Sequence, residues 1–310
     1  MLKVIFLILS SFLIMNASMA QTPQATQDYL KKSMAHFQGG EIDAALIDIN
    51  KAIELDPINV DAFFLRAAIR SKKGDEAGVL ADYNKIIELA PTAQGVEIIY
   101  TNRSMIRLQK GDVDGALGDL DKAISINPKV AEIYNGRAIA RLQKGNLEGA
   151  LSDYEKVIEL KPTLPSAFMG RGYFRMQKGD LDGALADFNK AIELKPNYAD
   201  SYVDRGLARG LKGDIDGALA DIKKGASLNP KSVSDISRGN FTSPFSDLNT
   251  FIKSHPANAR AFEIRGIFRL MQGKDTEAEQ DFHKSLELDP KLKSEIYKIT
   301  TEVKRPGKSG

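Results

Sequence analysis

Apolar positions in this chain recur every three or four residues, in segments that come in pairs. The stretch from 165 to 196 shows the pattern. Its first segment places Phe168, Gly172 and Arg175 on one helical face. Its second segment has apolar residues at the spacing of another amphipathic helix: Ala184, Leu185, Phe188, Ala191 and Ile192. The pattern therefore predicts two amphipathic helices.

The residues between these two segments favour a tight turn. Gly179, in "QKGD", can adopt the left-handed conformation that ends a helix. Asp180 and Asp182 then lie near the positive N-terminal end of the second helix, and Pro196 ends that helix. The stretch is predicted to form a helix–turn–helix whose apolar faces it cannot bury alone.

Nearly the same stretch recurs along the chain. "QKGNLEGALSDYEKVIELKP" stands 34 residues before "QKGDLDGALADFNKAIELKP", and "LKGDIDGALADIKKGASLNP" stands 34 residues after it. Prolines repeat at the same interval, at Pro23, Pro57 and Pro91, at Pro128, Pro162, Pro196 and Pro230, and at Pro256 and Pro290. The interval is 37 residues from Pro91 to Pro128 and 26 from Pro230 to Pro256. Stacking lets such units bury their faces on their neighbours, which predicts one elongated array.

This repeat resembles the tetratricopeptide repeat family. With residues 165–196 numbered 1 to 32, an aromatic residue stands at position 4 and a small residue at position 20 of each unit. The aromatic residues are Tyr29, Phe63, Tyr100, Tyr134, Phe168, Tyr202 and Phe262. The small residues are Ala45, Val79, Ala116, Ala150, Ala184, Ala218 and Ala278. The resemblance implies an all-α fold, an α-solenoid in which helix–turn–helix units form a right-handed superhelix.

The predicted domains follow from the register. We expect an array over residues 21–290, with about seven full units and one truncated unit near 231–256. Residues 291–303 are expected to form a C-terminal capping helix, and residues 304–310 a disordered basic tail.

Two positions depart from the family pattern together. Position 7, usually Leu, is basic: Lys32, Arg66, Arg103, Arg137, Arg171, Arg205, Arg265, and Arg238 in the truncated unit. Position 23, usually aromatic, is always acidic: Asp48, Asp82, Asp119, Asp153, Asp187, Asp221, Asp247 and Asp281. We expect structural ion pairs between the two positions, either within a unit or between neighbours, because a guanidinium can hold a carboxylate with two hydrogen bonds.

Position 11 carries a second basic residue one helical turn later. It is His36 in the first unit and Arg70, Arg107, Arg141, Arg175, Arg209 and Arg269 in the others. Two interpretations stay open. In the first, these side chains share the position 23 Asp or cap backbone carbonyls. In the second, some of them bind a partner's carboxylates, and the candidates are Arg107, Arg141 and Arg175.

The resemblance further implies that the first helix of each unit lines a concave surface. Positions 9 and 12 on that helix are mostly apolar, and the predicted partner-binding residues are Met105, Leu108, Ile139, Leu142, Tyr173, Met176 and Leu207. Such a surface suits an amphipathic helix or an extended segment of another protein. The alternative is that tight winding buries part of this stripe between neighbouring helices.

The N-terminus has the layout of a secretory signal peptide over residues 1–20. Lys3 precedes an apolar run from Val4 to Met15, and small residues Ser18 and Ala20 precede Gln21. The run is short for a spanning helix, although an uncleaved anchor is the alternative. We expect an exported protein, periplasmic or secreted, with no stable membrane span after cleavage.

Composition and motifs narrow the classes of function that this chain can have. The formal charge of +2, from 43 basic and 41 acidic residues, gives no signal for nucleic acid. Cysteine is absent, and His36, His255 and His283 lack metal-ligand spacing. No motif of an enzyme or cofactor site occurs. The sequence predicts a non-catalytic scaffold that binds a protein partner and needs no cofactor. A structural role in an envelope complex, through the convex face, the ends or homo-oligomer formation, is the alternative.

Overall fold

The computed structural model describes residues 23–93, 95–229, 248–271 and 273–303, and all regular structure in these ranges is helical. The all-α fold class predicted from the periodicity is therefore confirmed. The expected signal peptide, the basic tail and the truncated unit up to residue 247, with Arg238 and Asp247, lie outside the described residues.

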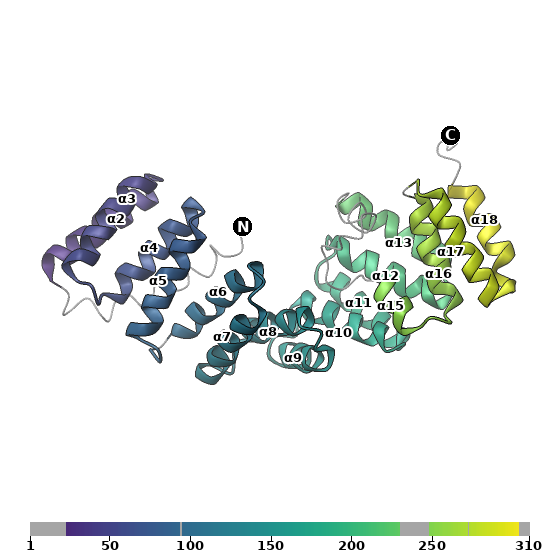
Figure 1. The fold of residues 1–310 in the computed structure, drawn as a ribbon, viewed down its shortest axis with the longest axis horizontal. Helices are drawn as coiled ribbons and strands as arrows, with labels where there is room; N and C mark the ends of the chain where they lie inside the picture. Colours follow the sequence, from purple (N-terminus) through teal and green to yellow (C-terminus); the bar gives the residue numbers. More distant parts are fainter. Residues whose placement is uncertain (1–22, 94, 230–247, 272, 304–310) are drawn as a thin grey trace. The chain divides into compact units, whose positions relative to one another are not determined.

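The described part of the chain divides into two compact units. The N-terminal unit, residues 23–146, stacks its helices in chain order (Figure 1). These helices are α2 (Gln24–Gln38), α3 (Ile42–Leu55), α4 (Val60–Lys73), α5 (Glu76–Leu89), α6 (Val96–Gln109), α7 (Val113–Ile126) and α8 (Ala131–Gln143).

The C-terminal unit, residues 147–303, continues the alternation and ends in a short extra helix. Its elements are α9 (Leu147–Leu160), α10 (Pro165–Gln177), α11 (Leu181–Leu194), α12 (Ala199–Lys212), α13 (Ile215–Leu228), α15 (Leu248–Ser254), α16 (Ala259–Met271), α17 (Asp275–Leu288), the 3₁₀ turn η3 (Pro290–Leu292) and α18 (Lys293–Val303). Helix α18 packs on α16 and buries Ile296 and Ile299. We call the first helix of a repeat its A helix (α2, α4, α6, α8, α10, α12, α16) and the second its B helix (α3, α5, α7, α9, α11, α13, α17).

The turn between A and B helices depends on one glycine and one aspartate. Gly179 has φ +81°, the left-handed conformation that ends α10. Asp180 then caps α11, because its side chain accepts a hydrogen bond from the backbone N–H of Gly183. A Cβ at Gly183 would lie 2.2 Å from the Asp180 carboxylate, so a larger residue there would require the Asp180 side chain to shift.

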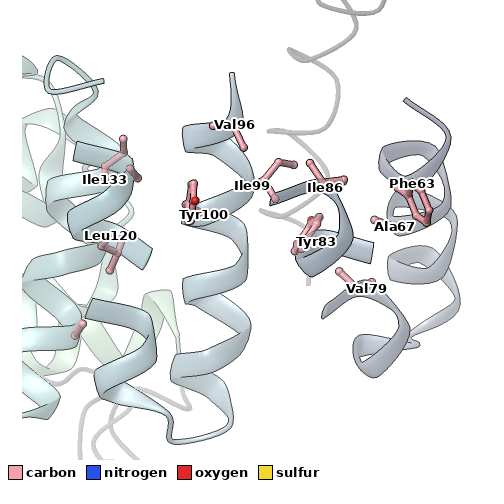
Figure 2. Close-up of a cluster of buried hydrophobic side chains, with 12 residues drawn as sticks. Phe63, Ala67, Val79, Tyr83, Ile86, Val96, Ile99, Tyr100, Leu120 and Ile133 are labelled. Carbon is pink, nitrogen blue, oxygen red and sulfur yellow. The ribbon is translucent and has the colours of Figure 1, made fainter. Parts of the chain in front are cut away.

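Neighbouring repeats share a continuous apolar core. Figure 2 shows this core in the N-terminal unit, where side chains from α4, α5, α6, α7 and α8 form one buried cluster. It contains Phe63, Val79, Tyr83, Ile99 and Leu120, each at most 6% exposed. The core of this unit is therefore continuous through the stack of helices and is not confined to single helix pairs.

Glycine also lets helices approach closely in the C-terminal unit. A Cβ at Gly170 in α10 would lie 2.2 Å from the ring of Tyr154 in α9, whose side chain is buried. Gly118 in α7 has no such neighbour, since nothing lies within 4 Å of a Cβ placed there.

We predict opposite effects of alanine at these two glycines. Gly170→Ala should lower the free energy of unfolding by about 1 to 3 kcal/mol, because the added methyl overpacks the contact with Tyr154. Gly118→Ala, the matched control, should raise it by about 0.5 to 1 kcal/mol, since alanine favours the helix. Urea unfolding followed by circular dichroism measures both, and equal effects would contradict the packing described here.

Candidate functional site

The position 7 arginines bind the position 23 aspartates of their own repeats. Nη2 of Arg66 lies 2.6 Å from Oδ1 of Asp82, and Nε also donates to this carboxylate. The same arrangement joins Arg103 to Asp119, Arg171 to Asp187, Arg205 to Asp221 and Arg265 to Asp281, at 2.5 to 2.7 Å. The aspartates are buried. Each pair thus fixes the A helix of a repeat against its B helix.

Five of the position 7 arginines also contact the preceding repeat. Nη1 of Arg66 donates to Oδ1 of Asn50 at 2.9 Å, and that of Arg103 to Asn84 at 2.7 Å. Equivalent contacts join Arg137 to Asp121, Arg205 to Asn189 and Arg265 to Asn249. The arginines therefore act both within a repeat and between neighbours. Asn or Asp two residues after the position 23 aspartate was the sequence signal for this second contact.

The remaining face of these guanidinium groups lies over an aromatic ring. Cζ of Arg66 is 5.2 Å from the ring centroid of Phe63, and Arg103, Arg137, Arg171, Arg205 and Arg265 lie 5.4 to 5.7 Å from the position 4 rings of their own repeats. Arg66, Arg103, Arg205 and Arg265 each contact a carboxylate of their own repeat, an amide of the preceding repeat and a ring, and therefore have framework roles. Arg137 and Asp153 belong to different compact units, and the expected pair between them stays a prediction.

The position 11 arginines share the same aspartates, which favours the first of the two interpretations for Arg107 and Arg175; their binding to a partner stays a prediction. Nη1 of Arg107 lies 2.8 Å from Oδ2 of Asp119 and donates to the carbonyl of Gly115. Nη1 of Arg175 makes the same contacts with Asp187 and the carbonyl of Gly183. One carboxylate has two oxygens and accepts from both arginines, so neither needs a partner's carboxylate. For Arg141 the assignment stays a prediction.

In the first repeat, His36 and Lys32 stand in place of the two arginines. His36 Nδ1 lies 2.8 Å from Oδ2 of Asp48, and Lys32 lies over the ring of Tyr29. His255 stacks on Phe251, with centroids 4.3 Å apart, and His283 lies 3.1 Å from Glu287. In the described ranges no group of three or more His, Asp or Glu side chains could hold a metal ion.

The predicted apolar stripe on the A helices differs between the two compact units. In the N-terminal unit Met105, Leu108, Ile139 and Leu142 are only half-buried. In the C-terminal unit Tyr173 is 5% exposed, and Met176 and Leu207 are each 2% exposed. The prediction of an open binding surface is therefore wrong for these last three residues.

The burial of Leu207 has a physical cause in α16, which packs on α12 (Figure 1). A Cβ at Gly210 in α12 would lie 2.3 Å from Cδ1 of Ile264, and one at Gly213 would lie 3.3 Å from the guanidinium of Arg260. Leu207 is three residues before Gly210, so α16 covers the face that carries both. His255, after α15, lies beside Gly179 at the end of α10. Sequence reasoning missed the contact between α12 and α16. The glycine at position 210, where most A helices carry a large apolar residue, was the signal for it.

A buried charge joins this region to the last helix. Nη1 of Arg260 donates to Glu263 at 2.7 Å and to Glu295 of α18 at 2.6 Å. Burial raises the pKa of Glu263, whose Oε1 has no hydrogen-bond partner among the described residues. Arg260 thus ties α16 to the terminal helix.

These features define a class of protein: an α-solenoid of helix pairs, joined by an arginine–aspartate framework. Tetratricopeptide repeat models match residues 29–59 and 102–165, and a TPR repeat model matches residues 172–213. The chain is a tetratricopeptide repeat protein.

Solved structures show the same fold at low sequence identity. A tetratricopeptide repeat protein from Parabacteroides merdae is 19% identical, with a TM-score of 0.58 over 90% of this chain and 100% of that one. PilF of Pseudomonas aeruginosa is 17% identical, with a TM-score of 0.57 over 70% of this chain and 97% of that one. YrrB, described as a TPR protein with an unusual peptide-binding site, is 21% identical, with a TM-score of 0.50 over 62% of this chain and 98% of that one. No curated protein sequence matches the chain.

The framework predicts a large difference between two aspartates of α11. Asp187→Ala should lower the free energy of unfolding by about 3 to 5 kcal/mol, because it leaves Arg171 and Arg175 without their shared buried partner. Asp182→Ala removes an exposed pair with Lys212 and should cost about 0 to 1 kcal/mol. Thermal unfolding of both variants tests this, and a midpoint unchanged in Asp187→Ala would sink the framework role.

Proposed function

We propose that this chain is an exported, non-catalytic scaffold that binds another protein on the A helices of its N-terminal unit. The observation that carries the proposal is the contrast between the units. Apolar residues at the same repeat positions are covered by the chain itself on α12, yet only half-buried at Met105, Leu108, Ile139 and Leu142. Half-buried apolar side chains on a rigid helix array suit a helix or extended segment of a partner.

The fold and one solved structure support a binding role. The tetratricopeptide repeat fold is in general a non-catalytic scaffold for protein interactions, and YrrB is described as having a peptide-binding site. In the described part of the chain, no cluster of side chains suits a metal. No described helix has both the length and the apolar composition to cross a membrane.

Export is proposed on the N-terminal layout alone. A basic residue at Lys3, an apolar run and small residues before Gln21 are typical of a cleaved secretory signal. The compartment we propose is the periplasm or the cell exterior.

A second candidate function is assembly of an envelope complex through the ends or through self-association. Ile47 in α3 is 71% exposed, and Ile58, in the turn after α3, is 72% exposed. Most other repeats have a small residue at the position of Ile47. Tyr297, on the terminal helix α18, is 74% exposed. Exposed apolar side chains in the first repeat and the last helix favour contacts at the ends.

Affinity capture from an envelope extract tests the A-helix proposal. Residues 21–310 would serve as bait beside Ile139→Glu with Leu142→Glu, which places two charges on the half-buried surface of α8. Lys122→Glu with Ser125→Glu, at exposed sites of α7, is the matched control. Circular dichroism should show all three baits folded.

We expect mass spectrometry to find a partner with the parent and the α7 control, and to lose it with the α8 variant. A partner that all three baits retain would contradict the A-helix proposal and favour the ends. If that partner is then lost from Ile47→Glu with Ile58→Glu, the assembly function replaces the scaffold.

A further inference from the structure

The exposed apolar side chains of this chain are concentrated on α3 and the turn that follows it. Ile47 in α3 is 71% exposed, and Ile58 in the turn is 72% exposed. Leu55, the last residue of α3, is 44% exposed. In the described part of the chain, the other exposed large apolar side chain is Tyr297 on α18.

The other repeats carry small or polar residues at the positions of the two isoleucines, although these positions are exposed there too. At the position of Ile47 they have Ala81, Gly118, Ser152, Ala186, Ala220 and Gln280. Ile58 follows a repeat proline, and the residues after the other described repeat prolines are Thr92, Lys129, Thr163, Asn197, Ala257 and Lys291. The repeat fold therefore does not require an apolar side chain at either position.

The exposed face of α3 also carries a pair of opposite charges. Ile47, Lys51 and Glu54 follow one another at intervals of four and three residues, which places them on one face of the helix. Nζ of Lys51 lies 2.7 Å from Oε2 of Glu54. The opposite face of α3 packs on α2 and α4 through its buried residues Ala45, Ile49 and Ala52. We call Ile47, Lys51, Glu54 and Ile58 the α3 patch.

The α3 patch is complementary to a second copy of itself. Its order along the chain is apolar, basic, acidic and apolar, and its intervals of four, three and four residues are the same in both directions. When a second α3 lies antiparallel to the first, Ile47 faces Ile58 of the second copy. In the same register Lys51 faces Glu54 of the second copy, and two-fold symmetry repeats both contacts. A parallel arrangement would instead place like charges opposite each other, which is unfavourable.

We propose that α3 forms a two-fold symmetric, antiparallel interface with α3 of a second copy of this chain. The isoleucine contacts remove the exposed apolar surface from water, and the charges form two ion pairs across the symmetry axis. One helix from each copy makes a small interface, so we expect a weak dimer with a Kd of about 10 to 100 µM.

This dimer would make the protein bivalent. The α3 patch lies on a B helix, so the half-buried residues on the A helices α6 and α8 stay outside the interface. Two copies would then offer two equal surfaces to a partner, which raises the avidity for a partner with more than one binding segment. The inference rests on the second candidate function, self-association, and does not require the A-helix proposal.

Sedimentation equilibrium of residues 21–310 tests the dimer. We expect a monomer–dimer equilibrium whose Kd rises about tenfold or more in Ile47→Glu with Ile58→Glu, because this variant places charges at both apolar contacts. Ser152→Glu with Thr163→Glu, at the same exposed positions of the repeat that contains α9, is the matched control and should leave the Kd unchanged. Circular dichroism should show that both variants are folded.

The absence of cysteine from the chain allows the register to be tested by disulfide trapping. Ile47→Cys and Ile58→Cys would be made as separate variants and oxidised, first separately and then mixed. We expect a disulfide dimer from the mixture, because residue 47 of one copy faces residue 58 of the other. Neither variant should crosslink with itself, since the two residues 47 lie about 16 Å apart along the helix axis. Efficient crosslinking of one variant with itself would overturn the antiparallel register.

Other outcomes assign the α3 patch elsewhere. A chain that stays monomeric at about ten times the expected Kd, or a dimer that Ile47→Glu with Ile58→Glu leaves intact, would overturn the inference. If the chain is monomeric and this variant loses a captured protein, a different protein occupies the patch and the second copy is ruled out. None of these results bears on the A-helix proposal, because the α8 variant tests that surface separately.

Discussion

The structure depends on a buried carboxylate that accepts from two arginines. Asp82 is typical: it lies on a B helix and holds Arg66 and Arg70 of the A helix through its two oxygens. Burying a charge costs free energy unless every lone pair finds a donor, and here both oxygens do. Because Arg66 also reaches Asn50, the same group sets the distance to the preceding repeat. Repeat packing is thus specified by directional contacts as well as by apolar area.

This framework leaves the outer A-helix positions free to differ. Position 12 carries a large apolar residue on most A helices, glycine on α12 and serine on α4. On α12 the glycine lets α16 pack directly against the helix, and the chain covers its own surface. On α8, Ile139 and Leu142 remain half-buried. Two units built on the same repeat therefore offer different surfaces to other proteins.

Much of this was predictable from the sequence, because it depends on local patterns. Periodicity, Gly179 with Asp180, and the prolines predicted the helix pairs, and the paired occurrence of Arg and Asp predicted contacts such as Arg171 with Asp187. The second acceptor of Arg205, Asn189, escaped notice because asparagine on a helix surface is common. The burial of Leu207 was not predictable, since it depends on α16, which follows a shortened repeat that breaks the register. The partner surface itself remains a prediction.

The contact between α12 and α16 also bears on how the protein folds. Most of the stack forms by contacts between adjacent helices, so a folded region can grow one helix at a time. Gly210 and Ile264, by contrast, are separated by 54 residues in the sequence. Closing such a loop costs entropy before any packing is gained, which slows this step relative to the growth of neighbouring repeats. The C-terminal unit therefore finishes folding late, once α16 has docked on α12, whereas the N-terminal unit can fold through contacts between adjacent helices.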